Sequence, residues 1–487
     1  MVLATTRPET KFGDTAVAVS PKDKRYKKYV GQEIEIEDLL GKSKIKVIED
    51  IAVDPDFGTG VVKVTPAHDF TDYEIGKRHN LPLVQVIGFD GKLNSRAGKF
   101  EGLYVKQARP AVVEELKTKG LIEKIDEKYA HRVGVCYKCG AVIEPLPKEQ
   151  WFIKVEELKK SAIEAVKKGE IKITPKNFEN HYFQWLESLN DWNVSRQIVW
   201  GIRIPAFKNK KTGEWVVTEG ENPGADFEQD VDTFDTWFSS AQWPFATLQT
   251  TREGDFEKFY PTSVLETSYD ILKAWVSRMV MMGLYRTGEV PFRQVLFHGI
   301  VNDPYGKKMS KSKGNVVNPL ELIDEYGADS VRFALIYGNA TGNDQAMSYT
   351  KLEAARKFVN KMRNIVRFVI EMKPENTKTE SDFSHPDDQK LMEEFDKTLK
   401  AVNKGLDTYD FNLAISSLYD FIWHYFADVY IEVSKSRREE AQPALEKVIK
   451  ASLQLLHPFM PFITEELYGL FPEAKKSIMI SKWPKKI

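Results

Sequence analysis

Cysteine is nearly absent from this sequence, which has two cysteines among 487 residues. Cys136 and Cys139 cannot build a disulfide framework, so a disulfide-rich secreted fold is excluded and a reducing, cytoplasmic setting fits best. Long apolar runs are lacking as well. No segment is long enough to span a bilayer and no secretory signal pattern is evident, so the sequence predicts no membrane partner.

An excess of charge of one sign is also lacking. Lys and Arg number 70 and Asp and Glu 71, which gives a formal net charge of -1 at pH 7. A field that attracts polyanions over the whole molecule is therefore excluded, and any nucleic-acid surface must be a local basic patch. Two basic stretches, residues 22–28 and 356–367, are candidates. The length favours two to four domains.

The first 148 residues predict a β-rich domain, because short alternating apolar segments are separated by Gly, Pro and Asp turns. Helices are expected at residues 69–79 and 110–119. The expected strands cover residues 1–6, 15–19, 34–37, 45–48, 60–65 and 83–87.

Polar side chains gather at two places in this first region. Asp69 and Asp72 should share one face of the helix that Pro66 introduces. Each cluster by itself is more typical of a helix cap or a turn than of a site. The first cluster comprises Thr5, Thr6, Arg7 and Glu9, and the second comprises Lys63, Thr65, His68, Asp69 and Asp72.

The two cysteines have the CxxC spacing of a zinc knuckle, and His131 lies nearby in sequence. A structural zinc ion takes four protein ligands, and the chain has no second cysteine pair. A metal-free turn is therefore favoured over a zinc site at Cys136 and Cys139.

The middle region, residues 149–348, alternates strands with helices. This order is typical of a parallel, doubly wound sheet that binds its ligand at the strand ends. The expected elements are a helix within residues 150–168, a helix over 267–282, a buried strand over 295–301, and helices that begin near Pro319 and Ala328.

A loop rich in lysine and serine follows the strand at residues 295–301. Lys308 and Lys311 lie three residues apart, so both ammonium groups can reach one polyphosphate, and Gly314 lets the backbone bend around it. Such a loop suits a site where negative charge develops and leaves as pyrophosphate. An isolated loop of this kind is more typical of a solvated surface.

The last region, residues 349–487, has helical periodicity almost throughout and predicts an all-α domain. Residues 354–369 form an amphipathic helix whose cations could face phosphates or simply be solvated. Further helical faces are expected over residues 411–435 and 453–468, and residues 373–388 read as an exposed linker. The cations of the amphipathic helix are Arg356, Lys357, Lys361, Arg363 and Arg367.

Together these motifs resemble the class I aminoacyl-tRNA synthetases over essentially the whole chain. KMSKS at residues 308–312, DTWFSS at 235–240 and the HG pair at 298–299 match signatures of that family. The resemblance implies a β-barrel-like editing domain (1–148), the C-terminal half of a Rossmann-like catalytic domain (149–348) and a helical-bundle anticodon-binding domain (349–487). It implies catalytic roles for Lys308, Ser310, Lys311 and Ser312, ATP contacts from His298, Gly299, Met309 and Lys311, and an amino-acid pocket of Trp237, Asp270, Ile271 and Trp275.

The polar clusters resemble the editing domain of the valine, isoleucine and leucine enzymes, and TTRPET and GTGVVKVTPAHDFTDYEIG are closest to the valine enzymes. A pocket for valine cannot strongly exclude threonine, a limit for which these enzymes are themselves the standard example. A second site that hydrolyses the wrong ester is the remedy. By this resemblance, Asp69 holds the amino group and Asp72 reads the hydroxyl. The implied editing residues are Thr5, Thr6, Arg7, Glu9, Lys63, Thr65, Asp69 and Asp72.

A His-x-Gly-His signature, which class I enzymes carry upstream of the editing insertion, is lacking, since none of the eight histidines has another three positions on. The first half of the nucleotide fold is therefore expected to be missing. We expect this chain alone to be nearly inert in adenylation, and pyrophosphate exchange at the rate of an intact enzyme would contradict that.

The resemblance implies a monomer that attaches valine to tRNA(Val) with ATP and Mg²⁺ and hydrolyses threonyl-tRNA. Two other functions stay open, a stand-alone tRNA-editing deacylase and a non-catalytic tRNA-binding protein. Isoleucine is a lesser alternative to valine as the substrate.

Overall fold

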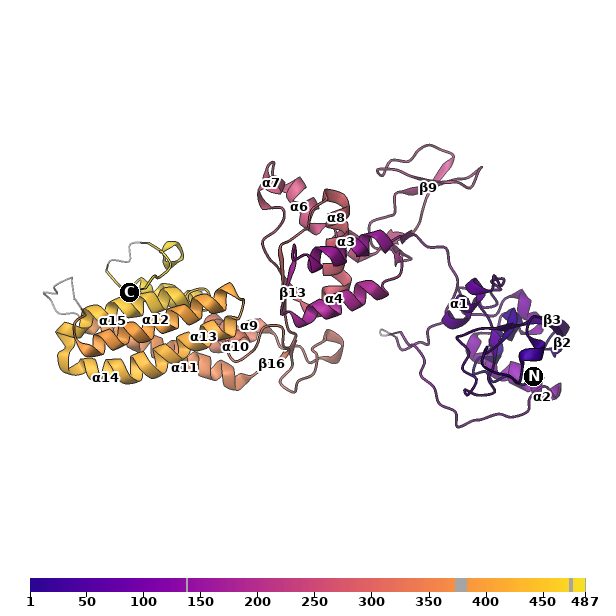
Figure 1. Ribbon diagram of the computed structural model, residues 1–487, viewed down its shortest axis with the longest axis horizontal. Coiled ribbons are helices and arrows are strands. Elements are labelled where there is room, and N and C mark those ends of the chain that lie inside the picture. The colour runs from indigo at the N-terminus through magenta and orange to yellow at the C-terminus, as the bar shows by residue number, and fades with distance from the viewer. Residues whose placement is uncertain (137–138, 373–382, 473–475, 487) are drawn as a thin grey trace. The chain divides into compact units, whose positions relative to one another are not determined.

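The computed structural model describes residues 1–136, 139–372, 383–472 and 476–486. The chain divides into two compact units, Met1–Gln150 and Trp151–Ile487, which are described separately below (Figure 1). Within the described residues, no helix combines the length and the apolar character needed to cross a bilayer.

The first unit is built on a four-stranded sheet in the order β2–β3–β1–β4. All four residues of the central strand β1 are buried, and β1 pairs parallel with β3 and antiparallel with β4. The sheet is open, with β2 and β4 at its edges, so the barrel-like form is not confirmed. The strands are β1 (Ala16–Val19), β2 (Glu33–Asp38), β3 (Gly41–Glu49) and β4 (Val61–Val64).

Two of the predicted strands in this unit were wrong. Residues 1–6 join no strand in the described part of the chain. Residues 83–87 contribute only an isolated bridge from Ile87 to Leu93, because the backbone N–H of Val86 donates to the His68 ring instead of a strand. The strands predicted at residues 15–19, 34–37, 45–48 and 60–65 are confirmed.

Two helices pack in the first unit, α1 (Phe70–Arg78) and α2 (Val105–Thr118). The first confirms the helix predicted at residues 69–79. The second begins five residues before Pro110, so the predicted start was wrong. Its buried residues Ala108, Val112 and Leu116 form a stripe with a spacing of four that continues across the proline, and this packing holds the helix.

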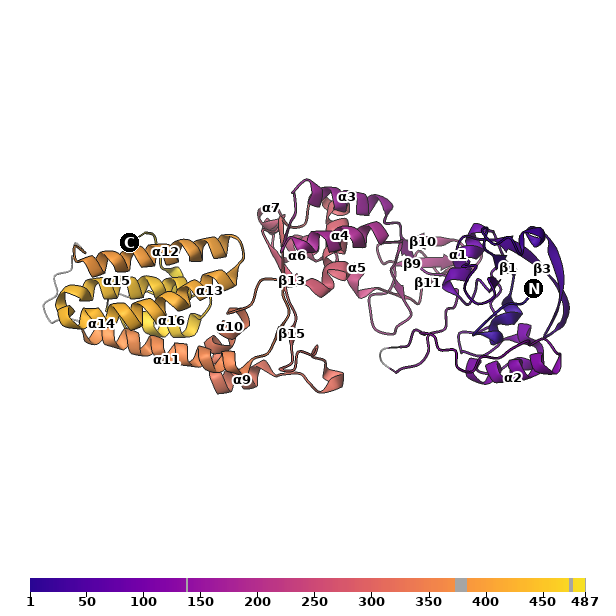
Figure 2. The ribbon, with the colours of Figure 1, turned by 60° about the horizontal axis from the view of Figure 1, so that its bottom comes forward.

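The second unit contains a parallel sheet in the order β13–β14–β6, as predicted for residues 149–348. Helices α3, α4 and α8 bury the apolar side chains of this sheet, and α3 packs against α8. Figure 2 shows α3 and α4 side by side. The elements are β6 (Lys172–Thr174), β13 (Leu265–Ser268), β14 (Gln294–His298), α3 (Glu156–Lys167), α4 (Asn177–Ser188) and α8 (Ser277–Thr287).

Three predicted elements of this region have different bounds. The helix expected within residues 150–168 starts at Glu156, after a short strand. The helix expected over 267–282 opens with a 3-10 turn and a π-helical segment, Leu272–Val276, before α8. The strand expected over 295–301 ends at His298, and β15 (Val301–Asn302) pairs with β16 (Gln345–Ala346) in a separate sheet.

Short elements complete this part of the second unit. They are β5 (Phe152–Ile153), β7 (Trp192–Asn193), β8 (Ser195–Arg196), β9 (Ala206–Asn209), β10 (Trp215–Val217), β11 (Phe227–Gln229), β12 (Thr233–Phe234), α5 (Thr236–Ser240), α6 (Trp243–Thr251) and α7 (Asp255–Phe259).

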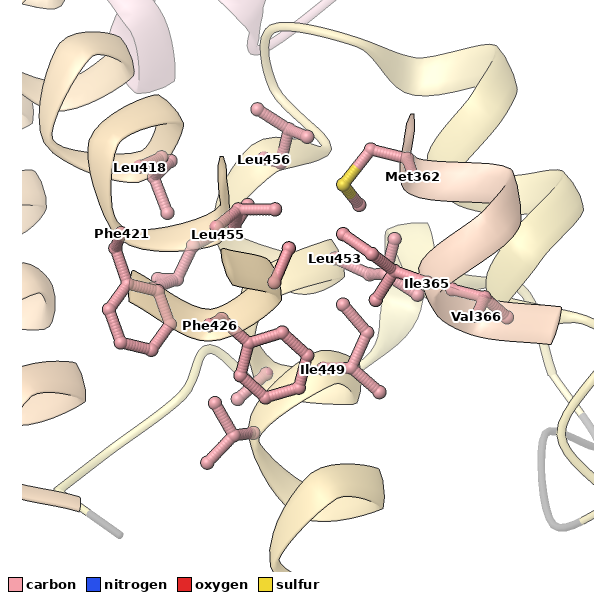
Figure 3. Close-up of a cluster of buried hydrophobic side chains, with 14 of the residues drawn as sticks. Met362, Ile365, Val366, Leu418, Phe421, Phe426, Ile449, Leu453, Leu455 and Leu456 are labelled. Carbon is pink, nitrogen blue, oxygen red and sulfur yellow. The ribbon is translucent and has the colours of Figure 1, made fainter. Parts of the chain in front are cut away.

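Beyond residue 318 the described chain is almost entirely helical. Met362, Leu418, Phe426, Ile449 and Leu453, from four segments of this region, meet in one apolar core (Figure 3). The helices are α9 (Pro319–Tyr326), α10 (Ala328–Ile336), α11 (Tyr349–Glu371), α12 (Pro386–Asp407), α13 (Phe411–Asp420), a π-helical segment (Phe421–Tyr430), α14 (Ile431–Ser434), α15 (Arg438–Leu456) and α16 (Pro461–Tyr468).

The helices predicted near Pro319 and Ala328 are confirmed. The single helix expected over 453–468 was wrong, because α15 ends before Pro458 and α16 begins at Pro461. Most of the linker expected over 373–388 lies outside the described residues, and α12 already begins at Pro386.

Candidate functional site

A buried lysine organises the polar cluster of the first unit. Lys63 on β4 donates from Nζ to Thr10 Oγ1 at 2.9 Å and to Asp14 Oδ1 at 3.1 Å, and it also contacts the Thr65 hydroxyl. Thr65 Oγ1 donates to the same Asp14 oxygen at 2.6 Å. Lys63 is only 7% exposed, so its charge is balanced inside the protein by the Asp14 carboxylate.

Asp72 and His68 lie buried beside this lysine. The backbone N–H of Thr65 donates to Asp72 Oδ2 at 2.8 Å, and burial raises the pKa of Asp72 to about 6. Burial lowers the pKa of His68 to about 4. Because His68 Nε2 accepts the N–H of Val86 at 2.8 Å, the ring is neutral and carries its proton on Nδ1, which faces the Pro145 carbonyl.

Glu9 lies fully buried between two guanidinium groups. Arg109 donates to its two oxygens at 2.8 and 3.0 Å, and Arg7 Nε donates at 3.3 Å. Arg7 also donates to the His68 carbonyl at 2.8 Å and forms an ion pair with Glu144. Glu9 therefore orients Arg7 and Arg109 and has little freedom to act as a base.

The two aspartates of the second cluster were predicted to share one helical face, and this was wrong. Asp69 is the N-cap of α1, and its Oδ1 accepts from Thr71 N at 2.8 Å and from Asp72 N at 3.1 Å. Its side chain is exposed, whereas the Asp72 carboxylate points inward. Thr5 and Thr6 are also exposed, so the site combines a buried half with a surface half.

Cys136 and Cys139 lie on either side of residues 137–138, and Gly140 N donates to the Cys136 carbonyl at 2.8 Å. Residues 137–138 lie outside the described part. Among the residues that the structure describes, no three or more His, Cys, Asp or Glu side chains are grouped to hold a metal ion. The described residues do not fit a four-ligand zinc site.

In the second unit, Asn315 holds the base of the lysine loop closed. Its Nδ2 donates to Asp303 Oδ2 at 2.9 Å and to the Lys308 carbonyl at 3.3 Å, and its Oδ1 accepts from Ser310 N at 3.0 Å. The Asn315 hydrogen bond is the main reason that the pKa of Asp303 lies below its ordinary value. Gly314 has a φ of +65°, so the predicted bend is confirmed.

The sheet ends where the lysine loop approaches. Lys308 Nζ lies 3.2 Å from Asp270 Oδ2, and this contact joins the loop to the turn after β13. His298, at the end of β14, bonds through Nδ1 to Glu266. His298 also pairs with Ser268 across the sheet, so Lys308, Asp270 and His298 all lie at the carboxyl ends of parallel strands.

The other residues predicted around this loop are placed as follows. The Met309 sulfur accepts from Val317 N at 3.3 Å, Lys311 opens a 3-10 turn, and the side chain of Ser312 lies outside the described part. A Cβ at Gly299 would lie 1.9 Å from the Asn343 carbonyl oxygen, so only glycine fits there.

The predicted amino-acid pocket residues lie on two neighbouring segments. Trp237 belongs to α5, and Trp275 belongs to the π-helical segment that follows Asp270 and Ile271. Both tryptophans are partly buried against the same apolar core, and α5 contacts the π-helical segment. Trp275 Nε1 donates to the Ser240 carbonyl at 2.9 Å, which links the two segments directly.

Three cations of the basic face predicted on α11 form ion pairs. Arg356 pairs with Glu353 at 2.9 Å, Lys361 with Asp428 at 2.8 Å, and Arg363 with Glu466 at 3.1 Å. These pairs are solvent-exposed, and exposed ion pairs are weak, so a phosphate can compete with the carboxylates for these cations.

Two family models match the chain. One, described as tRNA synthetases class I (I, L, M and V), matches residues 18–348, and the other, described as the anticodon-binding domain of tRNA ligase, matches residues 388–487. The chain belongs to the class I tRNA synthetases. The anticodon-binding model therefore covers the helical region after α11, beginning within α12.

Curated proteins similar to this chain include valine–tRNA ligases. The one from Fervidobacterium nodosum is 45% identical over 498 residues, with 99% of this chain and 57% of the relative covered. Those from Thermotoga maritima and Clostridium acetobutylicum are each 46% identical, with 99% of this chain and 57% and 56% of the relative covered. The class I chain spans a little over half the length of the curated relatives it matches.

Solved synthetase structures share the fold at low identity. A LeuRS–tRNA–LeuAMS ternary complex from Agrobacterium radiobacter K84 aligns with a TM-score of 0.54 at 18% identity, covering 99% of this chain and 60% of that one. Methionyl-tRNA synthetase of Mycobacterium tuberculosis bound by methionyl-adenylate aligns with a TM-score of 0.55 at 18% identity, covering 70% and 67%.

Sequence reasoning missed several residues that hold these sites together. Asn315 directly follows the lysine loop, and its polar side chain beside Gly314 was the available signal. Arg109 is 100 residues from Glu9, and Asp344 is 75 residues from Tyr269, whose hydroxyl donates to it. No local pattern marks such distant partners. Asp14 follows a turn and was overlooked for the same reason.

Proposed function

We propose that this chain carries the editing, C-terminal catalytic and anticodon-binding parts of a valine–tRNA ligase, in residues 1–148, 149–348 and 349–487. The observation that carries the proposal is the identity of 44–46% to valine–tRNA ligases over nearly the whole chain. In this reaction ATP with Mg²⁺ activates valine, and the valyl group is transferred to tRNA(Val).

The editing site hydrolyses threonyl-tRNA(Val) by a water molecule, with Asp69 on the substrate amino group and Asp72 on the threonine hydroxyl. Because its pKa is about 6, the buried Asp72 side chain is ionised at pH 7.5 and can accept a hydrogen bond from the threonine hydroxyl. A valine methyl at this position would offer that carboxylate no hydrogen bond in place of the one from threonine, at a cost of about 1–3 kcal/mol. This difference in hydrogen bonding supports threonyl-tRNA as the substrate of the editing site and explains why valyl-tRNA would not be hydrolysed.

Around these aspartates, the other polar residues bind and orient. Lys63 and Thr65 are fixed by Asp14, and Glu9 fixes Arg7, so the groups are arranged before the substrate binds. The exposed hydroxyls of Thr5 and Thr6 are placed to contact the ester and the 3′ end of the tRNA.

Replacing Asp69 by Asn tests the editing site. Asn keeps the N-cap of α1 but loses the negative charge, so deacylation of threonyl-tRNA(Val) should slow by at least about tenfold while the melting temperature stays unchanged. Glu74→Gln, on the exposed face of the same helix, is the matched control and should keep the full rate. Equal rates for the native chain and for Asp69→Asn would remove Asp69 from the site.

The lysine loop stabilises the pyrophosphate that leaves during valine activation. Lys308 and Lys311 supply the charge, Ser310 and Met309 hold the loop, and His298 and Gly299 lie at the strand end where the nucleoside of ATP would bind. The tryptophans Trp237 and Trp275 border the pocket for the small branched side chain.

Replacing Lys311 by Ala tests this loop. Because the chain alone is expected to be nearly inert in adenylation, the measurement is its affinity for pyrophosphate with Mg²⁺, which should fall by at least about tenfold when one charge of the loop is lost. Lys313→Ala, two residues along the same loop, should change that affinity less than threefold. An unchanged affinity in Lys311→Ala would remove Lys311 from the site.

A second candidate is tRNA editing without adenylation. Its support is that the whole polar network of the editing site lies inside the first unit. Deacylation of threonyl-tRNA by a chain that binds neither ATP nor a valyl-adenylate analogue would favour this function.

A further inference from the structure

The π-helical segment that carries Trp275 is held by groups outside its own backbone ladder. A π-helical turn leaves backbone carbonyls with poorer partners than an α-helix provides. Arg278 donates from one guanidinium nitrogen to the Lys273 and Ala274 carbonyls, each at 2.9 Å. The fully buried Ser277 hydroxyl donates to the Lys273 carbonyl at 2.8 Å. Arg278 and Ser277 therefore fix the backbone on which Trp275 is mounted.

The same arginine is tied to the segment that carries Trp237. Its guanidinium lies over the Trp192 ring, 4.6 Å from the centroid, and Trp192 Nε1 donates to Asp235 Oδ2 at 3.0 Å. Asp235 immediately precedes α5 and is 6% exposed, and Arg196 pairs with its other oxygen at 3.2 Å. Burial lowers the pKa of Arg278, and the charge of Asp235 opposes that effect.

The contacts among Asp235, Trp275, Arg278 and Trp192 form a closed circuit. Asp235 fixes the start of α5, and the carbonyl of Ser240 at its end accepts from Trp275 Nε1 at 2.9 Å. Trp275 comes directly after Lys273 and Ala274, whose carbonyls accept hydrogen bonds from Arg278. Arg278 in turn lies over the Trp192 ring, and Trp192 donates to Asp235. These contacts therefore link the backbone that carries Trp275 to the start of the helix that carries Trp237.

We propose that Arg278 and Asp235 are positioning residues that set the size of the amino-acid pocket by fixing Trp237 and Trp275. The substrate class is a small branched aliphatic amino acid, and the proposal rests on the proposed function for the pocket itself. Neither residue needs to touch the substrate. Their effect is on which side chain the space between the two rings accepts.

A structural role alone makes a different prediction. Removing one partner of a buried charge cluster leaves the other uncompensated and lowers stability. Lower stability by itself reduces the amount of folded protein, and it changes valine and isoleucine binding by the same factor. A change in the ratio of the two affinities is therefore the distinguishing result.

The test compares Arg278→Met, Arg278→Lys and Asp235→Asn with the native chain. Met keeps the length of the stem and loses the charge and donors, whereas Lys keeps the charge and one donor. Calorimetric binding of non-hydrolysable valyl and isoleucyl sulfamoyl adenylates gives the affinity ratio. We expect Arg278→Met and Asp235→Asn to lower the preference for valyl over isoleucyl at least fivefold, and Arg278→Lys to recover part of it. Arg286→Gln, exposed on α8, is the control and should keep the native ratio.

Indole N–H resonances give a readout that does not depend on ligand binding. The Trp275 indole, bonded to Ser240, should shift in Arg278→Met, and the Trp192 indole should shift in Asp235→Asn, with Arg286→Gln unchanged. Unshifted indoles, or shifted indoles with the native affinity ratio, would overturn the proposal. If the native chain binds neither adenylate analogue, the proposed function of the pocket fails, and the indole shifts alone decide whether Arg278 positions Trp275.

Discussion

At the scale of single residues, burial sets the chemistry of the polar cluster in the first unit. Asp72 is kept 7% exposed by the packing of α1 on the sheet, and its carboxyl holds a proton more tightly than usual. Burial lowers the pKa of His68 to about 4, so its ring is neutral, and its Nε2 accepts a backbone N–H. Lys63 Nζ pairs with the Asp14 carboxylate, 3.1 Å away, in the same surroundings. The environments of Asp72, His68 and Lys63 could not be predicted from their residue types alone.

The titration of Asp72 should appear in the stability of the first unit. The folded pKa of about 6 lies above the unfolded value of about 3.9, so the folded state binds the extra proton and loses stability as the pH rises from 4 to 6. Asp72→Asn removes this cost. The stability of the variant relative to the native chain should rise by about 2 kcal/mol between pH 4.5 and pH 8.

Urea unfolding of both proteins at the two pH values measures this difference. Glu74→Gln, exposed on the same helix, should show no such trend. A difference between native and Asp72→Asn chains that does not change with pH would mean that Asp72 titrates normally in the fold.

At the scale of elements, the sequence predicted those whose apolar pattern and end signals agree. The helices at Pro319 and Ala328 and the strands around β1 are examples, since proline, turn residues and alternation all point the same way. The failures have physical causes outside the local pattern. In the segment predicted as a strand at residues 83–87, the Val86 N–H donates to the His68 ring and not to a neighbouring strand. In α2, the stripe of buried apolar residues continues across Pro110.

The candidate sites divide in the same way. The lysine loop, the HG pair and the aspartates of α1 could be found because short motifs mark them. Arg109, Asp344 and Asp14 could not, because their partners are brought together only by the fold. The separation of Asp69 from Asp72 was missed because helical spacing does not show which residue is the cap.

The turn between β14 and β15 offers a test at this scale. A Cβ at Gly299 would meet the Asn343 carbonyl at 1.9 Å, which is far inside contact distance. Gly299→Ala should therefore destabilise the second unit by about 2 kcal/mol or more. Gly469→Ala, at the end of α16 where the nearest contact is 3.4 Å, should be nearly neutral.

Chemical denaturation of the two variants beside the native chain gives the comparison. A Gly299→Ala chain as stable as Gly469→Ala would show that the backbone around Asn343 yields at little cost.

At the scale of the whole molecule, the chain has two compact units with separate polar sites. The first holds the network around Lys63 and Asp72, and the second holds the lysine loop and the paired tryptophans. A small aliphatic pocket needs a second site that recognises a hydroxyl, since apolar packing separates valine from threonine poorly. The presence of both polar sites in one class I chain supports the proposed function, which rests on the identity to valine–tRNA ligases.

The most direct test of this account is the hydrolysis of two aminoacyl-tRNAs by the purified chain. Threonyl-tRNA(Val) and valyl-tRNA(Val) are supplied at equal concentration, and the release of each amino acid is followed in a single experiment. The account predicts that threonine is released at least about tenfold faster than valine. Equal rates for the two, or no release of threonine above the uncatalysed rate, would contradict it.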